Sequence, residues 1–163
     1  MTESAPSVNQ ESTAQMAQRV CGEQLAAILE QESGVRLGDV EAIHDMRVAT
    51  RRLRVTLINF ASCWSKPERQ QLKSWLQTLA DTLGEVRDLD VLMEALKPKL
   101  NQLAAPERPL LNNLIERLRQ QRKRRFQALL LYLESAAFLQ FKHEAPRLLA
   151  LSVNASTPPQ TNG

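Results

Sequence analysis

The chain has 163 residues, which is about the length of one ordinary domain and enough to bury a sizeable core. Helix formers dominate its composition and it has only five glycines and one tyrosine, so we expect an all-α fold rather than a β-sheet protein. The formal net charge of +3 is too small to identify a partner, and no apolar run approaches the roughly 18 residues of a membrane span.

Four amphipathic segments separated by helix breakers are expected to form helices. They span about residues 13–32, 38–62, 67–103 and 106–150. Asp39 is placed to cap the second helix, and Pro67 to open the third at its first turn. We expect Pro98 to end or kink the third helix, and Pro146 to do the same to the fourth. Four consecutive helices predict an antiparallel four-helix bundle.

Both ends of the chain are rich in Ser, Thr, Asn, Gln and Pro and have too few apolar groups to offset the entropy of ordering them. We therefore expect disordered tails over residues 1–12 and 151–163 around one domain over residues 13–150. The first residues lack the basic and apolar regions of a secretion signal, and Cys21 and Cys63 lack CxxC spacing. These features predict a cytoplasmic protein with reduced thiols.

A row of cations occupies one face of the second predicted helix. We call His44, Arg47, Arg51 and Arg54 the basic stripe, because their spacings of three, four and three residues place them within an arc of about 80°. The three arginines repel one another, and a bound polyanion would reverse the sign of that interaction. Guanidinium groups match phosphate oxygens, so phosphate is the predicted ligand class. The alternative is a solvated helix face with His44 hydrogen-bonded at its rim.

Three further arginines lie close to apolar helix faces. Arg87 borders the apolar face of the third helix, and Arg122 and Arg125 share the arc of leucines on the fourth. We expect these last two to run along the bundle interior, where a cation needs a ligand or a carboxylate. The alternatives are ion pairs: Arg87 with Asp88, Asp90 or a neighbouring helix, and the other two with glutamates of the first helix.

We expect no metal or cofactor and no enzymatic activity. His44 and His143 are far apart along the chain, and neither has a cysteine or carboxylate at ligand spacing. Hydrolysis of phosphoanhydrides needs metals held by several carboxylates, and the two-residue spacing of Asp88 and Asp90 places them on different helix faces. A metal-dependent phosphohydrolase using His44 and these aspartates is the weaker alternative.

Two motifs occur in order on the second and third predicted helices. The first is His44-Asp-Met-Arg47-Val-Ala-Thr-Arg51-Arg52-Leu-Arg54, and the second is Leu83-Gly-Glu-Val-Arg87-Asp88-Leu-Asp90-Val91. Together they resemble the signature of the CHAD family, the conserved-histidine α-helical domains, over about residues 10–145. The resemblance implies a helical bundle that binds inorganic polyphosphate without catalysis. It carries over six binding residues: His44, Arg47, Arg51, Arg52, Arg54 and Arg87.

The chain departs from the family pattern in size. CHAD proteins usually contain two four-helix halves related by a pseudo-twofold axis, and this chain resembles one half. We expect that a homodimer would rebuild the two-half arrangement, and that the protein associates with polyphosphate granules. The expected polyphosphate-binding residues are His44, Arg47, Arg51, Arg52, Arg54, Arg87, Arg122 and Arg125. The alternative function is nucleic-acid binding. The aromatic content of 4% argues against binding of single strands, because bases of single strands usually stack on aromatic side chains.

Overall fold

The computed structural model describes residues 11–151, which form helices and contain no strand. In chain order they are α1 (Thr13–Glu30), α2 (Glu32–Arg36), α3 (Val40–Asn59), α4 (Lys66–Leu100), α5 (Arg108–Glu134) and α6 (Ala136–Leu151), with a 3-10 turn at Ala61–Cys63. The all-α prediction is confirmed. The disorder expected of the tails concerns residues that lie almost entirely outside the described range.

Side chains at the helix starts explain where the helices begin. Ser12 and Ser65 each form a capping box with the residue three positions later, at the starts of α1 and α4. Asp39 accepts a hydrogen bond from the backbone N–H of Glu41 at 2.9 Å and starts α3, as predicted. Pro67 lies in the first turn of α4, where its missing N–H costs nothing. Local sequence therefore determines the start of each of these three helices.

The predicted fourth helix is divided at Ser135, and not at Pro146 as expected. The backbone of Ser135 is extended, with φ −71° and ψ 154°, and its hydroxyl accepts a hydrogen bond from the N–H of Phe138 at 3.3 Å. This side chain replaces the intrahelical partner that the first N–H groups of α6 lack. Pro146 lies inside α6, which continues to Leu151, and Pro98 lies in the last turn of α4, which ends at Leu100.

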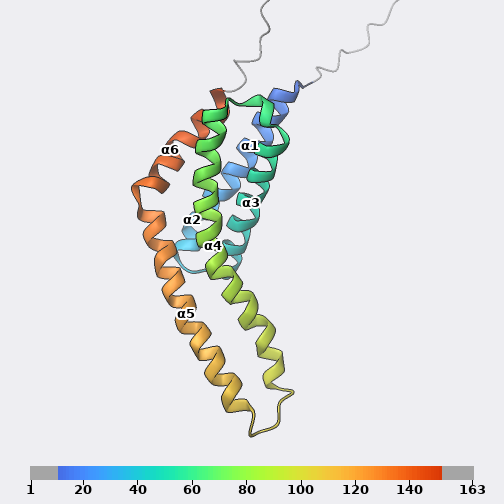
Figure 1. Cartoon of the computed structure of the whole chain (residues 1–163), viewed down its shortest axis with the longest axis vertical. Coiled ribbons are helices and arrows are strands. Elements are labelled where there is room, and N and C mark those ends of the chain that lie inside the picture. Colours follow the sequence, from blue (N-terminus) through green and yellow to red (C-terminus); the bar gives the residue numbers. More distant parts are fainter. Residues whose placement is uncertain (1–10, 152–163) are drawn as a thin grey trace, which may run out of the picture.

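The long helices pack side by side around one core. α3 packs against both α1 and α4. Figure 1 shows α5 running back along α4 and α6 continuing in the same direction beside the upper part of α4. The buried face of α3 contains Ile43, Met46 and Leu53, which are fully inaccessible to solvent. Trp75 of α4 meets Phe141 of α6 edge to face, with ring centroids 6.1 Å apart. Residues of α3, α4 and α6 thus belong to one buried core.

The far halves of α4 and α5 extend beyond the other helices as a two-helix hairpin (Figure 1). The hairpin has its own small buried cluster of Leu89, Met93 and Leu118. Its apolar residues are not all covered, since Leu110 and Leu114 are exposed. The hairpin thus offers apolar surface to solvent, away from the main core.

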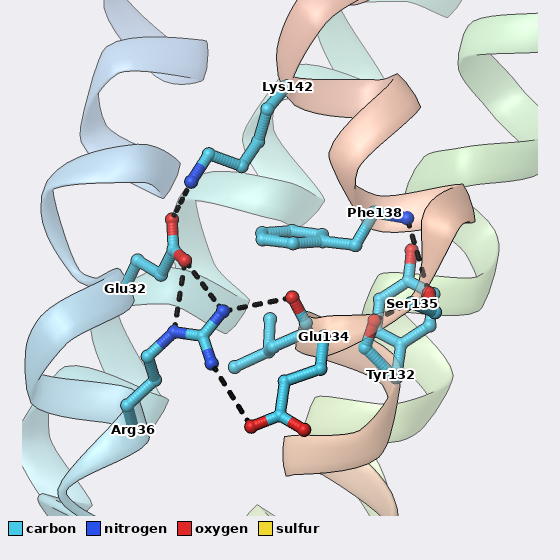
Figure 2. Close-up of polar contacts among 8 residues, drawn as sticks. Glu32, Arg36, Tyr132, Glu134, Ser135, Phe138 and Lys142 are labelled. Atoms are coloured by element: carbon cyan, nitrogen blue, oxygen red, sulfur yellow. Dashed lines mark hydrogen bonds and ion pairs between the residues drawn. The ribbon is translucent and has the colours of Figure 1, made fainter.

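A polar network around Glu32 fastens α2 to the junction of α5 and α6 (Figure 2). Lys142 Nζ lies 2.6 Å from one Glu32 carboxylate oxygen, and Arg36 Nη2 donates to the other at 2.9 Å. The same Arg36 nitrogen donates to the carbonyl oxygen of Leu133, also at 2.9 Å. Burial disfavours ionisation of Glu32, but the hydrogen bonds from Lys142 and Arg36 outweigh burial, so the pKa of Glu32 lies below its usual value.

Glu32 is expected to make the stability of the fold depend on acid. A carboxyl group whose pKa is lower in the folded state stabilises the fold above its unfolded pKa of about 4.3, and this stabilisation is lost as the pH falls through the folded pKa. We expect Glu32→Gln to lower the free energy of unfolding at pH 7 by about 1–2 kcal/mol, and the deficit to shrink in acid. Urea unfolding at pH 7 and below pH 4 measures both values.

Glu134→Gln is the matched control for that experiment, because Glu134 approaches Arg36 only to 3.9 Å and is exposed. We expect it to change the stability by less than about 0.5 kcal/mol at either pH. Equal effects of the two substitutions would contradict the role assigned to Glu32.

Candidate anion-binding site

The basic stripe lies on a face of α3 that borders the residues that α3 buries in the core. Arg47 and Arg51 are exposed, whereas His44 and Arg54 are half-buried at the border with neighbouring helices. The helical spacing of these residues places them on one face because successive side chains are rotated by about 100°. The predicted geometry of the stripe is therefore present in the structure.

Arg47 lies along α4 and contacts it at Gly84. A Cβ atom at Gly84 would lie 3.7 Å from Arg47 Nε, so the guanidinium passes directly over this glycine. Arg47 Nη2 is 3.5 Å from Asp88 Oδ1, and both side chains are exposed. An ion pair this exposed contributes at most about 1 kcal/mol, so a phosphate group can compete for Arg47.

Arg54 is held by a chain of hydrogen bonds that continues along α4. Its Nη2 donates to Gln77 Oε1 at 2.5 Å, and Gln77 Nε2 donates to Asp81 at 2.7 Å. The carboxylate therefore orients the arginine through an amide and does not neutralise it by direct contact. Its charge is left available for an external anion.

The contacts of Arg47 and Arg54 define the register between α3 and α4. The two helices are antiparallel (Figure 1), and Arg47 meets Gly84 while Arg54 meets Gln77, seven residues away on each helix. The same register places His44 level with Arg87 and Ile58 level with Lys73. We call this line of contact the α3–α4 seam. It brings Arg87 of the second motif to the level of His44 of the first.

Arg87 itself is largely buried, and its guanidinium Nη1 lies 3.7 Å from Glu94 of the same helix. That nitrogen has no hydrogen-bond partner among the described residues. If Arg87 formed an ion pair, we expected the carboxylate to come from Asp88, Asp90 or another helix. The partner is instead Glu94, which the sequence analysis did not single out. The long pairing distance leaves hydrogen-bonding capacity on Arg87 unused.

Arg52 faces away from the seam. With Arg51 it lines a shallow hollow of about 480 Å³ that also contains Val20 and Gln24 of α1. Within residues 11–151 no carboxylate forms an ion pair with Arg51 or Arg52. Arg51 therefore stands between the seam and the α1 side of α3, and Arg52 belongs to the α1 side.

The two inward arginines of the fourth predicted helix differ from each other. Arg122 is half-buried and forms a two-pronged pair with Asp90 of α4, whose side chain is 4% exposed. Arg125 is 47% exposed and pairs with Glu85 of α4 at 3.3 Å. The prediction that Arg125 lies in the bundle interior is wrong. The alternative prediction of glutamate partners on the first helix is also wrong, because α5 packs against α4 at this level and both partners come from α4.

A protein-family model for the CHAD domain matches residues 19–162, and both motifs fall within that range. The chain belongs to the CHAD family. It is also 34% and 33% identical, over 109 residues, to two uncharacterized proteins of Mycobacterium tuberculosis, from strains H37Rv and CDC 1551. Each alignment covers 67% of this chain and 21% of the relative, so the chain spans about a fifth of the length of these proteins.

Two cations of this CHAD chain that the sequence reasoning missed lie at one end of the seam. Arg69 and Lys73 of α4 line a pocket of about 190 Å³ together with Arg54 of the basic stripe. Arg69, Lys73 and Gln77 recur every four residues after Pro67, which places them on one helix face. That spacing was the available signal. Only the register of α3 against α4 shows that this face meets the basic stripe.

The described part of this CHAD chain offers no obvious place for a metal. Within residues 11–151 no group of three or more His, Cys, Asp or Glu side chains is arranged to hold a metal ion. Asp90 is occupied by Arg122, and Asp88 lies near Arg47. Over the same residues, no helix combines the length and apolar character needed to cross a membrane.

Proposed function

We propose that this CHAD domain binds inorganic polyphosphate along the α3–α4 seam and performs no catalysis itself. The observation that carries the proposal is the alignment of cations from two helices on one line. Arg47 and Arg54 come from α3, Arg69, Lys73 and Arg87 come from α4, and His44 lies level with Arg87. A linear polyanion with a charge on every phosphate matches a linear array of cations.

The linear arrangement of these cations suits a polymeric ligand better than a single small anion. Each exposed arginine on its own contributes little, because water screens it. A chain bound at one arginine, however, presents its next phosphates to the neighbouring cations at high effective concentration. Many weak contacts along the seam would then give firm binding overall.

The aromatic residues support polyphosphate over single-stranded nucleic acid as the ligand. Proteins that bind single strands usually offer aromatic faces on which bases stack. Trp64 and Trp75 are both buried in this chain, and Trp75 packs against Phe141. No base could stack on them without opening the core, whereas phosphate groups need only the cations.

Titration with polyphosphate at several salt concentrations tests the proposal. We expect the logarithm of the association constant to fall linearly with the logarithm of the salt concentration, because binding releases counterions from the polyanion. Competition with single-stranded and duplex DNA at equal phosphate concentration is the control. The proposal fails if DNA displaces bound polyphosphate as effectively as free polyphosphate does.

We further propose that the protein acts in the cytoplasm, at polyphosphate granules, and that it supplies one half of the two-half CHAD arrangement, which a second copy completes. The hairpin supports this dimer, since it exposes apolar residues that include Val91, Leu92, Leu110 and Leu114. Mass in solution should show a dimer, with or without polyphosphate.

The absence of catalysis that we propose is tested by incubating the protein with polyphosphate and Mg²⁺ or Mn²⁺. Phosphate release should stay at background, and turnover would restore the phosphohydrolase alternative.

A further inference from the structure

A small pocket lined by both cationic and aliphatic side chains lies at one end of the α3–α4 seam. It is formed by Arg54, Leu57, Ile58, Ala61, Arg69 and Lys73 and has a volume of about 190 Å³. Sites for drug-sized organic ligands usually measure about 300–1,000 Å³. The pocket therefore suits a small group, and its lining combines three cations with aliphatic side chains.

The charges of this pocket are not balanced by the protein. Within residues 11–151 none of Arg54, Arg69 and Lys73 forms an ion pair with a carboxylate. The buried Nε of Arg69 also has no acceptor in the same part of the chain. An unsatisfied buried donor destabilises the fold, and neighbouring like charges add to this cost. An anion in the pocket would remove both costs.

Beyond this pocket α3 adds no further cation to the line. Residues 55–65 contain no charged side chain, and Ile58 of α3 is 69% exposed. On α4 the next cation is Lys66, the first residue of the helix, and the acidic Glu68 lies in the same turn. A polyanion that continued along α3 past the pocket would lie against the apolar side chain of Ile58 and lose hydration without gaining a counter-charge from that helix. The favourable arrangement is one in which the chain ends here.

We infer that the pocket of Arg54, Arg69 and Lys73 holds the terminal phosphate of a bound polyphosphate chain, an inference that rests on the proposed function. A terminal phosphate has a second ionisation with a pKa of about 6, so at pH 7 it carries more negative charge than an internal phosphate. Three cations match that additional charge. The remaining lining residues, Leu57, Ile58 and Ala61, offer no counter-charge to a further phosphate.

Polyphosphate with chemically capped ends tests this inference against uncapped polyphosphate of the same length. Each is titrated into the parent protein and into the Arg69→Gln/Lys73→Gln variant, at equal phosphate concentration and low salt. We expect capping to weaken binding to the parent about tenfold, as the loss of one charge-assisted contact would. The variant should bind both polymers with the affinity that the parent has for the capped one.

Lys97→Gln/Lys99→Gln is the matched control, because it removes two exposed cations from the far end of the same helix. We expect this variant to keep the parent's preference for uncapped ends. If the Gln variant does not fold, the comparison of capped and uncapped polymer on the parent still decides.

The outcomes separate this inference from the proposed function. If the parent binds capped and uncapped polyphosphate equally, chain-end recognition is overturned while polyphosphate binding stands. If the parent binds neither polymer, the proposed function fails and the inference fails with it. Pyrophosphate bound as tightly as the long chain, and lost in the Gln variant, would make the pocket a site for free short phosphates and would also overturn the assignment.

Discussion

Replacing Arg122 with leucine is expected to destabilise the fold by about 3–5 kcal/mol, because it would leave the buried carboxylate of Asp90 without a partner. Arg122 also donates to the carbonyl oxygen of Gly38 at 3.5 Å and lies over the ring of Phe126. Gly38 has a positive φ of 79°, so this arginine helps to hold the turn between α2 and α3. Guanidinium chloride unfolding at pH 7 measures the effect.

Two further variants identify the cause of that loss. Arg122→Leu/Asp90→Leu removes both charges, and we expect it to recover much of the lost stability. Arg125→Leu breaks only the exposed pair with Glu85, so it should cost less than about 1 kcal/mol. A single Arg122→Leu variant that melts above the parent would contradict this account, and would mean that the half-buried arginine is held for a ligand at the expense of stability.

Replacing Arg47, Arg51 and Arg54 with alanine is expected to weaken polyphosphate binding at least about tenfold at low salt, since several charge-assisted contacts are lost together. The salt dependence should become shallower, because fewer phosphates are neutralised. Helicity should be kept, because alanine is a strong helix former and none of the three side chains is in the buried core. Titration and far-ultraviolet circular dichroism measure the two effects.

The matched control for the triple variant replaces Arg117, Arg119 and Arg124 of α5 with alanine. These three are exposed, and the net charge changes by the same amount as in the α3 variant. We expect this control to bind polyphosphate nearly as the parent does. Equal losses in the two triple variants would show that binding follows net charge and that the α3–α4 seam is not a specific site.

The sequence by itself determined the features of this CHAD domain that depend on local spacing. Composition predicted an all-α fold, and Asp39 and Pro67 marked the starts of two helices. The alternation of apolar and cationic residues from His44 to Arg54 separated the buried from the outer face of α3. These predictions succeeded because helix caps and helix faces follow from residues within a few positions of each other.

Only the tertiary structure decided which helix faces meet. The register of α3 against α4 brought Arg69 and Lys73 to Arg54, and put Arg87 level with His44. The packing of α5 on α4 gave Arg122 the partner Asp90 and left Arg125 exposed, although both share one helical arc. Helical periodicity gives the direction of each side chain about its own axis, whereas register and burial depend on contacts between residues far apart in the chain.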